Sequence, residues 1–336
     1  MTLSKSRSFS LYSLPTGIIR QDFSSFLLAG LLTALFLTSG AQAQTKNLEA
    51  IATLKFYAAA QGISIPVGGQ PTAILFDGSS VWVANGSTPS IKKLRASDGT
   101  VLATFATPDI ANGIAFDGAN IWMTHTATRR SASKMRASDG AIIGTFTFAA
   151  GIAPVGVAFD GANVWISGIS NNTVTKLRAS DGANQGTFPV GAAPTHLAFD
   201  GANIWVSNSG DASVTKLRAR DGVNLGTFSV GQAPGKLAFD DVSIWIPNGE
   251  SNSVTKLRAS DGLNQGTFAV GRGPTALAFD GTSMWASNNL ESTVTRLRTS
   301  DGHNLGTFPT GLGPDDVAFD GASIWVINAD GTVSKL

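Results

Sequence analysis

Alternation of apolar and polar residues is the dominant pattern along most of this chain. In His196–Asp200 (HLAFD), Leu197 and Phe199 fall on one side of an extended strand and Ala198 on the other. A second run, IWVSN, places Trp205 beside β-branched neighbours, and SVTKLRA and GTFSV follow after polar breaks. Asp-Gly and Gly-x-x-Pro stand at the joins, because tight turns need the backbone angles that these residues accept. One such unit therefore predicts four short antiparallel strands.

This unit recurs along the chain. All the tryptophans occupy one position in it, at spacings of 40, 43, 40, 40, 40 and 40 residues: Trp82, Trp122, Trp165, Trp205, Trp245, Trp285 and Trp325. A period of about 40 residues with several β segments per repeat is typical of propeller blades. A single four-stranded sheet of this size cannot bury both faces, whereas stacked copies can, and each tryptophan supplies apolar surface for that stacking.

The two ends of the repeat region supply complementary fragments of one blade. Residues 62–71 (GISIPVGGQP) match the fourth-strand segment of residues 186–194, although no first three strands precede them. At the other end, VAFDGASIWVINADGTVSKL supplies three strands and then stops. Pairing of Ile63–Val67 with those strands would close a ring and remove exposed sheet edges. We therefore predict an all-β, seven-bladed β-propeller over residues 62–336, preceded by an extension, residues 44–61, that fits the repeat poorly.

The repeat resembles that of the YVTN or YncE-like seven-bladed propellers. IWVSN lies where that family has its YVTN-like strand, TVTKLRASDGANQGTFPVG resembles its third and fourth strands, and APTHLAFDG resembles its Gly-Pro loop and following strand. The likeness covers about 275 residues. It implies an exported, ring-shaped scaffold. Known members include cell-surface and exported binding proteins, one of them reported to bind DNA, and related propellers include streptogramin lyases and haem enzymes, so the resemblance does not fix a function.

Residues 1–43 have the layout of a secretory signal. Basic residues precede an apolar run, Phe26–Leu37, and the small-residue sequence SGAQAQ follows, so we expect cleavage after Ala43. The apolar run is shorter than the roughly 18 residues that a bilayer span needs. The sequence thus predicts an exported protein, periplasmic or extracellular, with no membrane span after signal removal. A retained N-terminal anchor is the alternative.

Charge and composition narrow the classes of partner. Without residues 1–43 the chain carries 21 basic and 22 acidic residues. Proteins that neutralise many phosphates usually show a basic excess, so we do not expect a nucleic-acid partner. The chain has no cysteine, which excludes disulfides and thiolate metal sites. We expect a monomer without a cofactor.

Most of the charged residues belong to the repeat itself. The basic residues of the KLR segments number 13 of 24, and the aspartates of the FD and SDG segments number 13 of 23. Because these residues occur in every blade, we interpret them as structural. Arg178 and its equivalents are expected to pair with aspartates, and Asp181 to shape a turn rather than to bind calcium.

Positions where one blade departs from its siblings are better candidates for ligand contacts. The connections after the second and fourth strands share one face, and the extra residues of the 43-residue unit all fall in them, so this face is expected to bind. Just before the innermost strand, His196, Lys236 and Asp316 replace the alanine or glycine of the other four blades. We predict that these three gather at the channel mouth, where they would hold a small anion or polar ligand. The other candidates on this face, which are either ligand contacts or solvated loop residues, are His125, Arg129, Arg130, Arg272, Asp315, Asp109, Glu250 and Glu291.

Catalytic motifs are weak in this sequence. It has three histidines, of which His303 is expected on the opposite face from His125 and His196, and it has neither an HExxH nor a GxSxG pattern. The leading hypothesis is a non-enzymatic binding or interaction scaffold for an unknown small polar ligand or a protein or cell-surface partner. The alternative is a lyase or hydrolase that resembles streptogramin lyases and uses His196 with Lys236 or Asp316 at the channel mouth. No metal site or haem ligand is expected.

Overall fold

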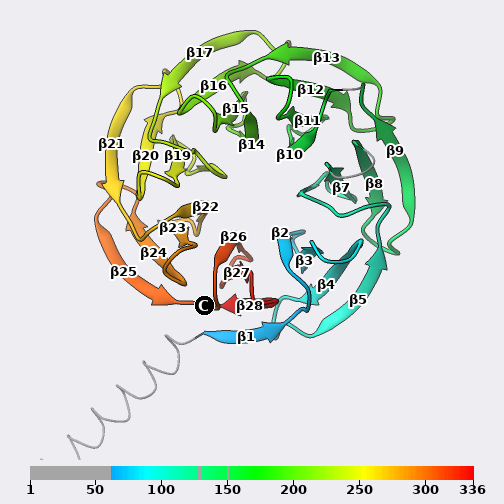
Figure 1. Ribbon diagram of the computed structural model, residues 1–336, viewed down its shortest axis with the longest axis horizontal. Coiled ribbons are helices and arrows are strands. Elements are labelled where there is room, and N and C mark those ends of the chain that lie inside the picture. Colours follow the sequence, from blue (N-terminus) through cyan, green and yellow to red (C-terminus); the bar gives the residue numbers. More distant parts are fainter. Residues whose placement is uncertain (1–61, 127–129, 150) are drawn as a thin grey trace, which may run out of the picture. The chain divides into compact units, whose positions relative to one another are not determined.

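The computed structural model describes residues 62–126, 130–149 and 151–336, which form 28 strands in seven antiparallel sheets of four strands each. The sheets stand around a common axis as the blades of a propeller (Figure 1). The predicted all-β, seven-bladed fold is confirmed. The predicted signal segment, residues 1–43, and the extension, residues 44–61, lie outside the described residues.

Blades 1 to 6 each run from an innermost to an outermost strand in chain order. Blades 1 to 3 are β2 (Pro71–Phe76), β3 (Ser80–Asn85), β4 (Ser90–Arg95) and β5 (Val101–Ala106); β6 (Gly113–Phe116), β7 (Asn120–His125), β8 (Ser131–Arg136) and β9 (Ile142–Thr147); β10 (Pro154–Phe159), β11 (Asn163–Gly168), β12 (Thr173–Arg178) and β13 (Asn184–Pro189). Blades 4 to 6 are β14 (Pro194–Phe199), β15 (Asn203–Asn208), β16 (Ser213–Arg218) and β17 (Asn224–Ser229); β18 (Ala238–Phe239), β19 (Ser243–Asn248), β20 (Ser253–Arg258) and β21 (Asn264–Ala269); β22 (Pro274–Phe279), β23 (Ser283–Asn288), β24 (Thr293–Arg298) and β25 (Asn304–Pro309).

Blade 7 is assembled from both ends of the described chain. It comprises β26 (Pro314–Phe319), β27 (Ile324–Asn328) and β28 (Thr332–Lys335), with β1 (Ile63–Pro66) as its outermost strand. Ile63 lies opposite Lys335 and Pro66 opposite Thr332 in an antiparallel ladder. The ring is therefore closed by the N-terminal strand, as predicted, and β1 and β28 lie side by side in Figure 1.

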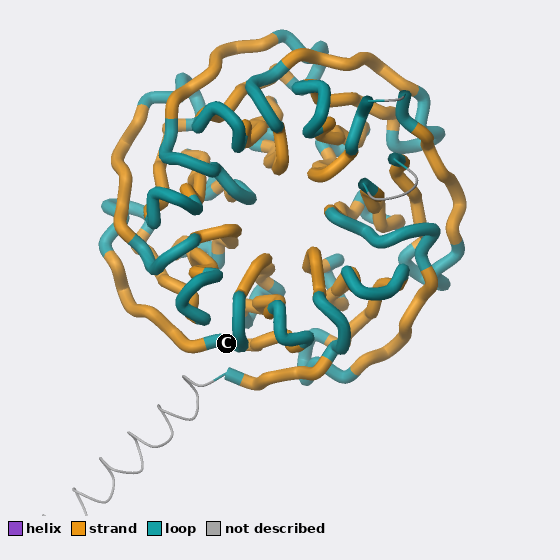
Figure 2. Tube along the Cα trace, viewed as in Figure 1, coloured by secondary structure: helices purple, strands orange, loops and turns teal. Residues whose placement is uncertain are grey.

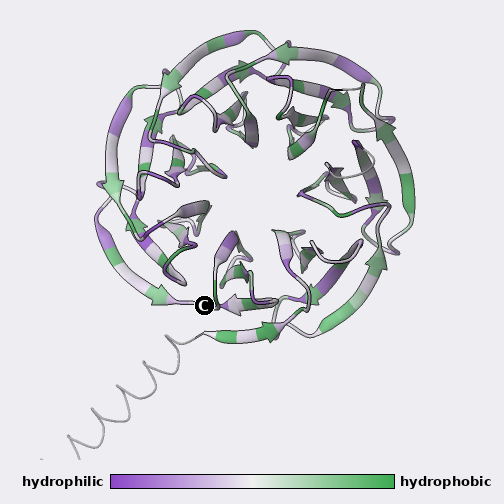
Figure 3. Cartoon of the chain, in the orientation of Figure 1, coloured by the Kyte–Doolittle hydropathy of each residue, from purple (hydrophilic) through white to green (hydrophobic). Residues whose placement is uncertain are grey.

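Strands and short loops alternate around the whole ring (Figure 2). The outermost strands carry both hydrophobic and hydrophilic residues along their length (Figure 3). In β17, exposed residues alternate with partly buried ones, as expected where one face covers the blade and the other meets water. Within the described ranges no helix is long and apolar enough to cross a bilayer.

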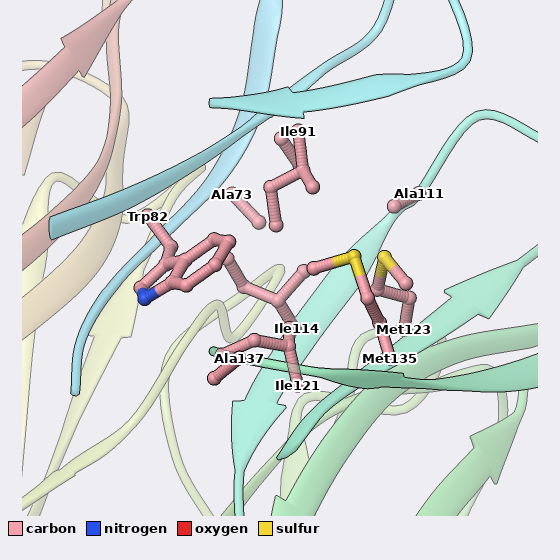
Figure 4. Close-up of a cluster of buried hydrophobic side chains, with 10 residues drawn as sticks. Ala73, Trp82, Ile91, Ala111, Ile114, Ile121, Met123, Met135 and Ala137 are labelled. Atoms are coloured by element: carbon pink, nitrogen blue, oxygen red, sulfur yellow. The ribbon is translucent and has the colours of Figure 1, made fainter. Parts of the chain in front are cut away.

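The hydrophobic core lies between neighbouring blades. Trp165 of blade 3 packs in one cluster with Ile204 and Leu217 of blade 4. Figure 4 shows the corresponding cluster between blades 1 and 2, in which Trp82 lies among side chains such as Ile121. Six of the seven tryptophans have an exposed fraction of 0%. Since burying a large aromatic side chain is among the strongest apolar contributions to folding, this ring of tryptophans stabilises the blade-to-blade contacts.

Repeated charged residues fix each tryptophan in place. In blade 4, Trp205 Nε1 donates to Asp200 Oδ2 at 2.8 Å, and all seven blades repeat this bond. Lys216 Nζ lies 5.1 Å from the centroid of the Trp205 ring and donates to the Ala259 carbonyl of blade 5 at 2.6 Å. Five other lysines make the same inter-blade bond. These charges hold the ring together, in agreement with the structural interpretation of the repeat.

The second set of repeated charges shapes exposed turns. Asp181 Oδ1 accepts hydrogen bonds from Ala183 N at 3.0 Å and from Arg178 Nε at 2.9 Å. Gly182, which lies between Asp181 and Ala183, has φ +74°. A Cβ at this position would lie 1.8 Å from the Phe146 ring of the preceding blade. Only glycine therefore fits this turn. Asp181 acts as a turn residue, as expected.

The two aspartates of one blade should contribute very differently to stability. Asp200→Ala leaves the buried Trp205 indole N–H and the backbone N–H groups of Ala202 and Asn203 without their acceptor. We expect this substitution to cost about 2–4 kcal/mol of unfolding free energy in urea denaturation. Asp221→Ala removes exposed pairs with Arg218 and Arg220 and a turn contact with Val223 N, so the urea midpoint of this variant should stay close to that of the wild type. Equal losses in the two variants would contradict the assignment of the FD aspartates to the inter-blade core.

Candidate functional site

All seven innermost positions line one cavity. Its volume is about 540 Å³, and it is lined by Ala73, Gly113, Gly156, His196, Lys236, Ala276 and Asp316, one from each blade. Glu250 and Gly273, from loops that follow a second and a fourth strand, line it as well. The cavity therefore opens on the face predicted for binding. The structure brings His196, Lys236 and Asp316 together there, whereas their role in binding a ligand stays a prediction.

A salt bridge links two of these residues across an intervening blade. Lys236 Nζ, from blade 5, lies 2.8 and 2.7 Å from the two carboxylate oxygens of Asp316, in blade 7. The Asp316 side chain is 9% exposed and also accepts hydrogen bonds from Ile74 N at 3.1 Å and Val317 N at 2.8 Å. Four donated hydrogen bonds thus occupy acceptor positions on this carboxylate. Asp316 thus ties blades 5, 7 and 1 together at the axis.

Pro247 explains how Lys236 reaches so far. In blade 4, Ser207 Oγ accepts a hydrogen bond from the backbone N–H of His196 at 3.1 Å, which keeps the innermost segment on its own blade. Blade 5 has Pro247 at the serine position, so no hydroxyl is available. Lys236 N donates instead to Thr275 O of blade 6 at 2.9 Å, and β18 shrinks to Ala238–Phe239. The released segment carries Lys236 towards Asp316.

His196 is a neutral imidazole at this site. The pKa of His196 is lowered to about 4, mainly by burial and also by repulsion from Lys236, while the charge of Asp316 partly opposes both effects. The ring is therefore uncharged at pH 7. Its Nδ1 atom is buried and has no hydrogen-bond partner among the described residues. A buried polar atom without a partner is costly, so it marks a place where a ligand group can gain a hydrogen bond.

Asp315 is a second polar group without a partner. Its backbone carbonyl accepts a hydrogen bond from Thr275 Oγ1 at 2.7 Å, but its carboxylate makes no hydrogen bond or salt bridge within the part of the chain that the structure describes. The pKa of Asp315 is raised to about 6, mainly by burial and also by the charge of Asp316, while Lys236 opposes both effects. The carboxylate is still largely ionised at pH 7.

Two adjacent loops build one side of the cavity. Glu250 follows β19 and Leu290 follows β23 at the equivalent position, and both line the cavity. Leu290 is 64% exposed, although most sibling blades have a small or polar residue there. Asn289 Nδ2 donates to Pro314 O at 3.2 Å and fixes its loop to blade 7. The side of the cavity formed by these loops is therefore both acidic and apolar.

The remaining predicted residues are not brought to this cavity. His125 is fully buried at the end of β7, where Nε2 lies 2.7 Å from Ser133 Oγ and Nδ1 lies 3.0 Å from Ile110 O. Asp109 is also buried, outside the cavity lining. Arg130, Arg272 and Glu291 are exposed loop residues that do not line it, and Arg129 lies outside the described residues. Only His196, Lys236, Asp315, Asp316 and Glu250 among the candidates share the cavity.

The donor set does not suit a metal ion. Within the described ranges no three His, Cys, Asp or Glu side chains lie close enough to hold one. Lys236 occupies both oxygens of Asp316, and His303 is in the β24–β25 turn, on the other face. The described residues of this cavity therefore form no metal site.

Sequence reasoning missed Pro247, Asn289 and Leu290. Pro247 gave a signal, because proline replaces the serine of three sibling blades in the middle of a strand, where it disturbs pairing. Leu290 also departs from its siblings, but an apolar residue in a predicted loop does not reveal which way it faces. The contact of Asn289 depends on the folded loop.

Comparison with known proteins supports the architecture. No protein-family model matches the chain, and neither does any curated protein sequence. Among solved structures, it is similar to hydrazine synthase of Kuenenia stuttgartiensis, with 17% identity and a TM-score of 0.70 over 81% of this chain and 96% of that chain. It is also similar to a catalytically inactive virginiamycin B lyase from Staphylococcus aureus with quinupristin (18% identity, TM-score 0.71, 81% of this chain and 97% of that chain). A streptogramin B lyase structure matches with 16% identity and a TM-score of 0.67, over 82% of this chain and 95% of that chain. At these identities the likeness establishes the propeller fold alone.

The charge of Lys236 should contribute to the lowered pKa of His196. In an NMR titration of the imidazole we expect a pKa of about 4 for His196. Lys236→Met should raise it towards the ordinary value, because the substitution removes a repulsive charge and leaves the attraction of Asp316 uncompensated. Arg272→Met, which removes a cation from the same face but not from the cavity, is the control and should leave the curve unchanged. An ordinary pKa for His196 in the wild type would refute this description of the cavity.

Proposed function

We propose that this chain is an exported binding protein, not an enzyme, and that it holds a small polar ligand in the cavity at the propeller axis. The observation that carries this proposal is that one cavity is lined by the innermost position of every blade, and only three blades carry a polar side chain at that position. An apolar pocket with a few converging polar groups is the usual form of a small-molecule site. Four positions keep alanine or glycine, which leaves room for a ligand between the innermost strands.

His196 and Lys236 are better suited to binding a ligand than to transferring a proton. A general base works best when its pKa is near the operating pH, and His196 has a pKa of about 4. Lys236 Nζ is already bound to both carboxylate oxygens of Asp316, so it is not free to react with a ligand. These groups are suited to orienting a ligand through hydrogen bonds.

Export and family membership are part of the same proposal. Export is supported by the basic lead, the apolar run Phe26–Leu37 and the small residues before Ala43. Membership of the YVTN or YncE-like propellers is supported by the IWVSN and APTHLAFDG motifs. We expect a periplasmic or extracellular monomer that contacts its ligand through the face bearing Glu250 and Leu290.

A lyase is the second candidate, since the fold resembles virginiamycin B and streptogramin B lyases and His196 lies in the axial cavity. Quinupristin, present in one similar structure, is the probe for this alternative. Turnover of quinupristin by the wild type, lost in a His196→Gln and Lys236→Met double variant that still folds, would establish the lyase and refute the binding-only role.

Ligand retention tests the proposed function directly. Protein purified under native conditions from its own host should carry a small molecule that mass spectrometry detects and that raises the melting temperature. His196→Gln should reduce the retained amount at least about tenfold, because a buried hydrogen-bonding group loses more than about 1.4 kcal/mol when unmatched. His303→Gln changes the same residue type on the opposite face and should retain the ligand. Absence of any retained molecule, together with no thermal shift across sugars, peptides and amines, would refute the proposal.

A further inference from the structure

Two groups in the axial cavity can both accept hydrogen bonds and have no partner. The Asp315 carboxylate has no hydrogen bond or salt bridge within the described ranges, and neither has the buried Nδ1 of His196. Leaving an ionised carboxylate partly desolvated and unpaired is costly. A ligand that supplies N–H donors and positive charge would relieve the cost at both groups.

The charge balance of the cavity favours a cation. Its ionisable lining residues are one cation, Lys236, three acids, Glu250, Asp315 and Asp316, and the neutral His196. Lys236 and Asp316 neutralise each other in their salt bridge. The charges that remain, on Asp315 and Glu250, are both negative. An anion entering this space would therefore meet repulsion, whereas a cation would be attracted.

Apolar residues occupy much of the remaining lining. Leu197, Val157 and Ile114 come from adjacent innermost strands, and Leu290 and Pro274 lie on the blade 6 side. These side chains provide a surface for a hydrocarbon or aromatic group. They also argue against a bare metal ion, for which the described residues provide no group of three ligands.

On the basis of the proposed function, we infer that the ligand is an organic cation with an ammonium group and an apolar body. The ammonium group donates hydrogen bonds to Asp315 and His196, and the apolar body packs against Leu290 and Leu197. Glu250, which is exposed and also lines the cavity, attracts the cation as it approaches. The Lys236–Asp316 salt bridge stays intact when the ligand binds.

Three probes with the same side chain but different charge test this inference. They are phenylalanine amide, a cation, N-acetylphenylalanine amide, which is neutral, and N-acetylphenylalanine, an anion. Isothermal titration of the full chain at pH 7, where the amine of the probe is largely protonated, should give the cation at least about tenfold tighter binding than either of the others, since the charged pair contributes more than a neutral hydrogen bond. Asp315→Asn, which keeps the side-chain shape, should weaken binding of the cation about tenfold and leave the neutral probe unchanged.

Glu291→Gln is the matched control, because it removes an acid from the same face without touching the cavity. Binding of the cation should be the same in this variant as in the wild type. Equal binding of the three probes, preference for the anion or binding of none would each overturn the cation inference. These results leave the proposed function standing as long as a native ligand is retained and is lost with His196→Gln. Loss of cation binding in Glu291→Gln would also overturn the inference, because the cation would then bind outside the cavity.

Discussion

The packing of a tryptophan between each pair of blades is the interaction on which the rest of the structure depends. Trp205 contacts the next blade through its ring, is fixed at its indole N–H by Asp200 and is covered by Lys216, whose ammonium reaches a carbonyl of that same next blade. One aromatic ring and two charged side chains thus join two sheets that share no backbone ladder. Because this unit recurs in the blades, the repeated lysines and FD aspartates have a structural role.

Closure of the ring is what allows the repeated blade contacts to enclose a single axial cavity. Trp325 packs against Ile74 and Val81 of blade 1 just as Trp205 packs against blade 5, and β1 completes the last sheet. Seven equivalent positions then surround one cavity, so that single-blade departures from the repeat meet there even when they are 80 residues apart, as Lys236 and Asp316 are. The propeller thus brings the innermost positions together, and the residues that differ from the repeat there, His196, Lys236 and Asp316, provide the polar groups of the cavity.

The sequence predicts the architecture well because the tryptophan spacing and the two complementary ends leave little freedom. The convergence of His196, Lys236 and Asp316 is likewise a consequence of their shared repeat position. The orientation of the loop candidates could not be predicted in the same way, because the position of a residue in the repeat does not determine whether its side chain points into the cavity. Arg272 faces solvent, whereas Glu250 lines the cavity. His125 ends a strand whose side chains pack internally, so its ring is buried against the Ile110 carbonyl and Ser133. The isolation of the Asp315 carboxylate depends on which neighbour captures Lys236, and only the three-dimensional arrangement decides that.

The central claim is that positions two blades apart meet at the axis, and a double-mutant cycle on Lys236→Met and Asp316→Asn tests it most directly. With unfolding free energies from urea denaturation, the account predicts a coupling energy of at least about 1 kcal/mol between the two substitutions. Each substitution should lower the unfolding free energy less in the background of the other substitution than in the wild type. Additive effects, within about 0.3 kcal/mol, would show that the two side chains do not interact and would contradict the convergence of the blades on a single site.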